Sequence, residues 1–143
     1  MNHIAFMKHS LGFYPKLLTG EKTVESRWYS SKKAPFNKVF VGDIVFFKDS
    51  NTPVSLCAVV SEVLQFENLN PDAINIILKK YHNMIGISDV DNFFEFVKMK
   101  RYCVLIFLSD FKKIVPFNID KTGFGQMCAW ICVDDINSIR VLV

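Results

Sequence analysis

The sequence predicts an α+β fold in which an antiparallel β-barrel carries two to three peripheral helices. Runs of alternating apolar and polar residues, separated by clusters of turn-forming residues, outnumber the other segments and are typical of strands. Segments with apolar residues at helical spacing are fewer and cluster in the middle of the chain. Half of the 143 residues are hydrophobic, which is enough for one packed core. We therefore expect a single domain over residues 1–143.

The first half of the chain is predicted to form one short helix and three strands. The helix is expected over residues 11–19, because Pro15 lies near its start and Gly20 can provide a C-terminal cap. The strands are expected at residues 22–29, 43–48 and 54–66. The segment 30–38 is rich in Ser, Lys and Pro, so we expect a loop there.

The second half is predicted to form two helices and then further strands. Asn70 can cap a helix over residues 71–83, and a capping box of Ser88 and Asp91 predicts a second helix over residues 88–98. The later strands are expected at residues 101–109, 112–119 and 127–133, with a short one within 136–142. The first of these is apolar on both faces, so it should lie centrally in the sheet.

Composition narrows the classes of function. A net charge of +3 permits an anionic partner without requiring one. The chain shows no signal-peptide pattern and no apolar run long enough to cross a membrane. We therefore expect a cytoplasmic protein with four free cysteines and no membrane partner. Cysteines and histidines at metal-binding spacing and glycine-rich phosphate loops are absent from the sequence, so we expect no metal and no cofactor.

The segment Gly20–Trp28, with the sequence GEKTVESRW, carries the densest charge pattern of the chain. Lys22 lies at the turn that enters the predicted strand. Side chains alternate between the faces of a strand, so three polar residues share one face: Thr23, Glu25 and Arg27. Charges this close are costly to bury unless they pair or serve a ligand. We therefore expect Glu25 and Arg27 within ion-pair reach, with Lys22 open to the same concavity; a surface ion pair is the simpler alternative.

A second segment, Val41–Phe47 with the sequence VGDIVFF, follows at a characteristic distance. Together the two segments resemble the ASCH domain family, whose pattern is G-x-K-T-x-E-x-R, a basic loop, and then G-D-x-[IV]-x-F. The resemblance is good over residues 11–66 and looser toward Ala129 and Trp130. It implies a PUA-like β-barrel, similar to the RNA-binding PUA domain, and a cleft at the first motif for an RNA-like ligand.

The resemblance also implies a rival function. Some members of the superfamily are amidohydrolases that deacetylate N4-acetylcytidine with a lysine, a threonine nucleophile and a distant glutamate. The lysine corresponds to Lys22, but this chain has Glu25 at the position of the nucleophile, while Thr23 lies at another position of the motif. A carboxylate cannot replace a hydroxyl nucleophile, although it can activate water. Lys22 and Glu25 are therefore catalytic candidates only for a hydrolase of this altered kind, or for a ribonuclease.

Two further features are candidates for ligand contacts. The loop lysines Lys32, Lys33 and Lys38 are either a solvated surface or a phosphate-contacting rim beside the cleft. Phe124 lies between two glycines in a loop, so it can either stack on a base or plug one end of the barrel.

The preferred function is therefore binding of RNA, or of a modified nucleoside, in a charged cleft. The expected ligand-binding residues are Lys22, Thr23, Glu25, Arg27, Lys33 and Phe124. The alternatives are the hydrolase described above and an interaction module whose cleft is empty. The identity of the ligand and the oligomeric state do not follow from the sequence.

Overall fold

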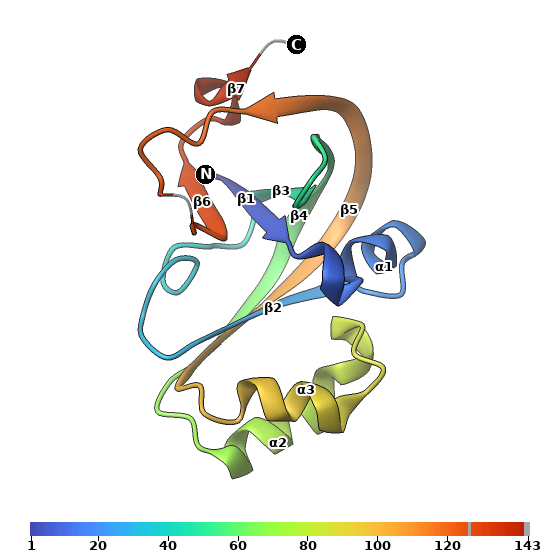
Figure 1. Cartoon of the computed structure of the whole chain (residues 1–143), viewed down its shortest axis with the longest axis vertical. Coiled ribbons are helices and arrows are strands. Elements are labelled where there is room, and N and C mark those ends of the chain that lie inside the picture. Colours follow the sequence, from blue (N-terminus) through green and yellow to red (C-terminus); the bar gives the residue numbers. More distant parts are fainter. Residues whose placement is uncertain (126, 142–143) are drawn as a thin grey trace.

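The computed structural model describes residues 1–125 and 127–141 (Figure 1). The strands are β1 (Asn2–Met7), β2 (Val24–Tyr29), β3 (Ile44–Asp49), β4 (Val54–Phe66), β5 (Tyr102–Ile119), β6 (Trp130–Val133) and β7 (Arg140–Val141). The α-helices are α1 (Phe13–Thr19), α2 (Pro71–Ile85) and α3 (Val90–Val97), and short 3-10 helices cover His9–Leu11 and Ile136–Ser138. The predicted α+β class is thereby confirmed.

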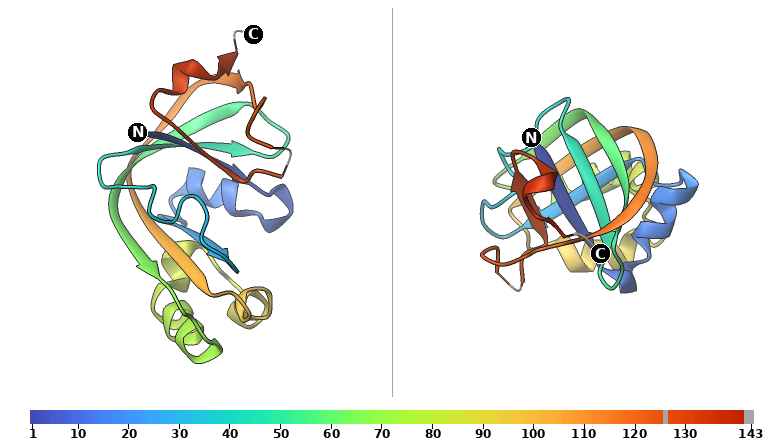
Figure 2. Two further views of the ribbon diagram at one scale, coloured as in Figure 1. Left: turned by 90° about the vertical axis from the view of Figure 1, so that its left-hand side faces the viewer. Right: turned by 90° about the horizontal axis from the view of Figure 1, so that it is seen from above.

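The strands form one curled, mixed sheet with the order β2-β5-β4-β3-β1-β6, and β7 pairs with β5. All pairs are antiparallel except β1 with β3, which is parallel. Figure 2 shows the strands curling around one interior to form a half-barrel. The expected barrel fold is thus confirmed as a half-barrel, in which β2 and β6 lie at the two ends of the hydrogen-bonded path.

Strand β5 organises the sheet. It is 18 residues long and pairs with β2, β4 and β7. Its first half is buried and central, as expected, but the two strands predicted at 101–109 and 112–119 are one continuous strand. The strand bends where a turn was expected. Asp110 has a φ of 52°, and the register of β5 against β4 shifts at several points.

Helices α2 and α3 pack against one end of the sheet (Figure 1). The side chain of Asn70 accepts a hydrogen bond from the Ala73 amide at the start of α2, as predicted. The predicted capping box of α3 is wrong: Asp89, not Ser88, accepts the Asn92 amide. The apolar faces of both helices share a core with β2 and β5, whose members include Val24, Ile74, Leu78, Val97 and Leu105.

Strand β1 was not predicted, and the late strand is shorter than predicted. β1 lies between β3 and β6, and its residues Ala5 and Met7 belong to the core inside the half-barrel. β6 begins at Trp130, three residues after the predicted start. The predicted tail strand is confirmed at β7, while residue 142 lies outside the described residues. Among the described residues, no helix is long and apolar enough to cross a membrane.

Candidate functional site

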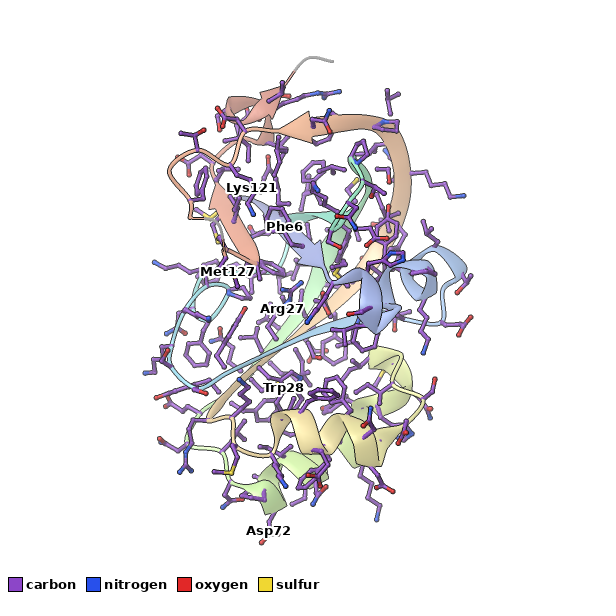
Figure 3. The ribbon with its side chains drawn as sticks, in the orientation of Figure 1. Phe6, Arg27, Trp28, Asp72, Lys121 and Met127 are labelled. Carbon is purple, nitrogen blue, oxygen red and sulfur yellow. The ribbon has the colours of Figure 1, made fainter. Side chains whose placement is uncertain are left out.

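A pocket of about 730 Å³ opens where β2, α1, α3 and the end of β1 meet. Glu25 and Arg27 line it from one face of β2, and Ser26 and Trp28 line it from the other. Because β2 ends the sheet path and pairs only with β5, the pocket follows the free edge of this strand. The predicted motif therefore does border a concavity, and Figure 3 shows Arg27 and Trp28 along that edge.

Lys22 lies behind this pocket rather than in it. Its side chain is 0% exposed, and its Nζ donates to the carbonyl oxygens of Val24 and Ile85, each at 2.8 Å. The same Nζ lies 3.2 Å from Glu25 Oε1 and 4.5 Å from the centre of the Phe13 ring. An ammonium has three N–H donors, and these three oxygens occupy them. The expectation that Lys22 opens onto the concavity is therefore wrong: as an entry-turn residue it folds inward beneath the motif.

Glu25 is held between two cations at the wall of the pocket. The residue is 3% exposed. Its Oε1 accepts from Lys22 Nζ and from the Ser26 amide at 2.9 Å, and its Oε2 accepts from Arg27 Nη2 at 3.1 Å. Burial by itself would raise the pKa of Glu25, but the charges of Lys22 and Arg27 outweigh burial and hold this pKa below its ordinary value. Burial lowers the pKa of Lys22, and Glu25 opposes that shift.

Arg27 connects β2 to the other end of the sheet. Its Nη2 donates to the carbonyl of Phe6 at 3.1 Å, and its Nη1 donates to the carbonyl of Ala129 at 3.2 Å. Its guanidinium lies 5.2 Å from the centre of the Trp130 ring. Arg27 therefore bridges the open side of the half-barrel with its side chain, between β2 and β6, which do not pair in the part of the chain that the structure describes. The predicted ion pair between Glu25 and Arg27 is confirmed.

The structure does not bring the other predicted residues into the pocket wall. Thr23 is absent from the lining, and its backbone bonds Met84 and Leu108 instead. Lys33 lies just outside, with its Nζ 4.8 Å from the centre of the Tyr29 ring, and Tyr29 does line the pocket. Phe124 is 36% exposed in a separate loop and does not line the pocket. Lys33 is thus a rim residue, whereas Phe124 is remote.

Sequence reasoning missed the aromatic wall. Phe13 and Phe93 line the pocket together with Trp28, and Phe93 lies edge-on to Trp28 with ring centres 6.2 Å apart. Phe93 lies on the face of α3 that packs against the helical core. Only the tertiary structure shows that this face ends at the rim of a pocket, because the packing of α1 against α3 is not encoded in either helix.

A buried polar network behind Arg27 was also missed. Trp130 Nε1 donates to His3 Nδ1 at 3.0 Å, and His3 Nε2 lies 2.8 Å from Asp43 Oδ2. Because the indole can only donate, Nδ1 must accept, so His3 is neutral with its proton on Nε2. Burial lowers the pKa of His3, in agreement with this tautomer. The network fixes the indole ring on which Arg27 rests, and no local motif would have revealed it.

Among the described residues, no group of three or more His, Cys, Asp and Glu side chains could hold a metal ion. The arrangement instead offers a fixed anion, an aromatic wall and a bridging guanidinium around one pocket. These are groups for binding an organic ligand that has both flat apolar surface and hydrogen-bond donors.

The half-barrel, its helices and the edge-strand pocket define an α+β fold built on one curled, mixed sheet. The crystal structure of ASCH from Zymomonas mobilis matches with a TM-score of 0.69 at 14% identity, covering 96% of this chain and 90% of that chain. Crystal structures of a tyrosine-to-phenylalanine variant and a serine-to-alanine variant of the same protein also match with a TM-score of 0.69. The sequence identities are 14% and 15%, respectively. Both matches cover 96% of this chain, and they cover 93% and 91% of the matched chains.

At this identity the likeness shows the fold alone. No family model matches the sequence, and no curated protein matches it. The sequence resemblance to the ASCH domain is therefore confirmed in three dimensions, while ligand and activity have to be argued from the site.

Proposed function

We propose that the protein binds RNA by accommodating one base, or a modified nucleoside, in the pocket beside β2. The observation that carries this proposal is Glu25, an ionised and immobilised carboxylate in the wall of a pocket that Trp28 and Phe93 also line. The shared ASCH fold and the motif in Gly20–Trp28 support a ligand of this class.

The chemistry of the wall suits a nucleobase. Each base has a π-face that stacks on aromatic side chains, and stacking of this kind contributes about 1–3 kcal/mol per base. A carboxylate held in its charged form can only accept hydrogen bonds. Glu25 therefore favours bases that present N–H donors on an edge, and it disfavours edges that present acceptors alone.

The remaining residues have distinct roles in this proposal. Lys22 positions Glu25 from behind and does not touch the ligand, because its three donors are already used. Arg27 orients the second carboxylate oxygen, and Lys33 beside Tyr29 offers a cation at the rim for a backbone phosphate.

We propose binding rather than hydrolysis. A general base must take a proton, and a carboxylate whose pKa is held below its ordinary value by two cations is a poor one at neutral pH. Lys22 has no free donor to polarise a carbonyl group. Incubation with N4-acetylcytidine should therefore release no cytidine above the uncatalysed rate, and turnover that disappears in Glu25→Gln would establish the hydrolase instead.

The binding test compares two adjacent aromatic residues of α3. Phe93 lines the pocket, whereas Phe94 packs only against the helical core, so Phe94→Leu is a matched control for Phe93→Leu. In fluorescence titrations with short single-stranded RNAs at low salt, Phe93→Leu should weaken binding about 5- to 150-fold, which corresponds to the stacking energy of one base. Phe94→Leu should leave binding unchanged. Absence of binding to the unmodified protein, or equal effects of both variants, would refute the pocket as the binding site.

A further inference from the structure

A second, smaller pocket of about 400 Å³ adjoins the first. The two pockets share Phe6, Met7, Lys8 and Ala129 in their walls, so they adjoin along these residues and are together called the groove. Figure 3 shows Lys121, Phe6, Arg27 and Trp28 one below the other in the middle of the view. A ligand in the first pocket can therefore extend over Phe6 into the second.

The second pocket brings two lysines to one aromatic ring. Lys121 Nζ lies 4.3 Å from the centre of the Phe6 ring, and Lys48 Nζ lies 5.9 Å from it. Lys48 reaches the ring from the neighbouring parallel strand, because Phe6 and Lys48 are register partners of β1 and β3. Lys121 arrives from the loop after β5. Two segments that are far apart in the sequence thus place like charges on the same ring.

The protein itself supplies little compensation for these two charges. Among the described residues, neither lysine forms an ion pair, and the polar contact of Lys48 is with the carbonyl of Ser50 at 3.2 Å. The nearby carboxylate of Asp49 is engaged by His9 and by the Ser50 amide. Burial, and then the charge of Lys121, lower the pKa of Lys48. The charge of Asp49 opposes this shift only in part. Like charges that are brought together with one acid, which is itself bonded to other groups, favour an anionic partner.

We infer that Lys48 and Lys121 form a phosphate subsite on Phe6, so that the groove takes a base in its first pocket and the attached backbone phosphate in its second. The inference rests on the proposed function, because the first pocket must hold the base. It narrows the ligand from a nucleoside to a nucleotide unit, and it favours a unit within a single strand, since the shared wall allows the chain to run across both pockets. Phosphate suits the site because a lysine ammonium binds phosphate as a point charge and needs no planar, bidentate geometry.

The test compares three kinds of ligand on two double variants. A nucleoside, its 5′- and 3′-monophosphates and a short single-stranded RNA are titrated against the unmodified protein, Lys48→Met/Lys121→Met and Lys79→Met/Lys80→Met. The last variant removes the same charge from exposed positions of α2 that line neither pocket. The subsite variant should bind the nucleoside as before and lose affinity for the phosphorylated ligands. The slope of log affinity against log salt should become shallower by about 0.7 for each RNA phosphate that the variant no longer neutralises.

The outcomes separate the two proposals. If the nucleoside binds and the two double variants have equal affinities for each ligand, the phosphate subsite is refuted and the base pocket is retained. If the unmodified protein binds none of the nucleosides or RNAs, the proposed function fails; inorganic pyrophosphate then tests the lysine pair alone, and equal binding to the unmodified protein and the subsite variant overturns the subsite. Monophosphates that bind as tightly as RNA would identify a free nucleotide as the ligand, whereas much tighter RNA binding supports a strand.

Discussion

Lys22 and Lys121 are both cations close to a phenylalanine ring, yet they are held in opposite ways. Lys22 is fully buried over Phe13, and every donor of its ammonium group meets an oxygen of the protein. Lys121 lies over Phe6 at the edge of a groove and, among the described residues, forms no ion pair. The first cation is satisfied by the fold, and the second is left for a partner.

The difference teaches how to sort charged residues along one groove. A buried charge survives only when the protein compensates it, so its removal leaves another group uncompensated and damages the fold. A charge at the rim of the groove compensates no buried group, so its removal should change ligand binding and leave the stability of the fold nearly unchanged. Charge in the sequence therefore does not indicate a ligand contact until its partners are known.

The largest effect on stability is expected for Lys22→Ala. It should lower the free energy of unfolding by about 3–5 kcal/mol, because Glu25 keeps its buried charge with one cation fewer and two carbonyls lose their donor. Urea unfolding at neutral pH measures the change. Lys79→Ala, at an exposed position of α2, is the control and should stay within about 0.5 kcal/mol. A loss below about 1 kcal/mol for Lys22→Ala would mean that Lys22 is not the internal partner of Glu25 described above.

The packing around Lys22 is tested next by Gly86→Ala. Gly86 has a φ of 88°, and an added Cβ would lie 3.2 Å from Lys22 Cβ and from Lys16 Cδ. We expect a loss of unfolding free energy of at least about 1–2 kcal/mol from the left-handed backbone alone, with a further loss from the close approach of these atoms. Gly20→Ala is a matched control, because Gly20 has a φ of 82° and open space around the added atom. Equal losses in thermal or urea unfolding would show that the contact with Lys22 adds nothing.

His3, in the network behind Arg27, is a third case: its imidazole is buried, and it stays neutral instead of carrying a charge. Burial lowers the pKa of His3 in the folded protein. Below about pH 6.5, His3 therefore binds a proton in the unfolded chain but stays neutral in the folded protein. Stability should therefore fall as the pH is lowered from 6.5 toward the folded pKa, by at most about 1.4 kcal/mol per pH unit for this one proton.

Urea unfolding across pH 8 to 5 checks this, with His3→Gln as the reference, because the glutamine amide also combines a donor group with an acceptor group and does not titrate. The variant should lack the part of the slope that His3 contributes. The folded pKa values of Glu25 and Asp43 are also lowered, but their contribution is present above their ordinary values of 4.5 and 3.8 and is lost only below them. Identical pH profiles for both proteins would contradict the neutral His3.

The smallest effect on stability is expected for Lys121→Ala. Its removal should change the free energy of unfolding by no more than about 0.5 kcal/mol. It should also raise the pKa of Lys48, because the charge of Lys121 contributes to lowering that pKa. An NMR titration of the lysine side chains measures the pKa, and urea unfolding measures stability. A loss comparable to that of Lys22→Ala would show that the two cations do not differ in the way described.

Much of the fold was predictable because its signals are local. Asn70 caps the start of α2 as predicted, since a cap is defined by a few neighbouring residues. The length of β5 was not predictable from residues 109–112, because a bend within a strand and a turn between strands use the same residue types. β1 was missed because its place depends on its two neighbours, β3 and β6, which lie far away in the sequence.

The site was predictable in part for the same reason. The pairing of Glu25 with Arg27 follows from strand alternation, which is a two-residue rule. The burial of Lys22 depends on the carbonyl of Ile85 at the end of α2, and the lysine pair at Phe6 depends on two segments that meet only in the folded chain. Neither arrangement can be predicted from the local pattern of residues.

By itself the sequence determined the α+β class, the start of α2 and the same-face placement of Glu25 and Arg27, because periodicity and capping act over a few residues. Only the tertiary structure decided which charges are compensated within the fold and which remain at the groove. That decision depends on the oxygens and rings that distant segments bring to each cation, and the energy of a charge is set by these surroundings rather than by its position in the chain.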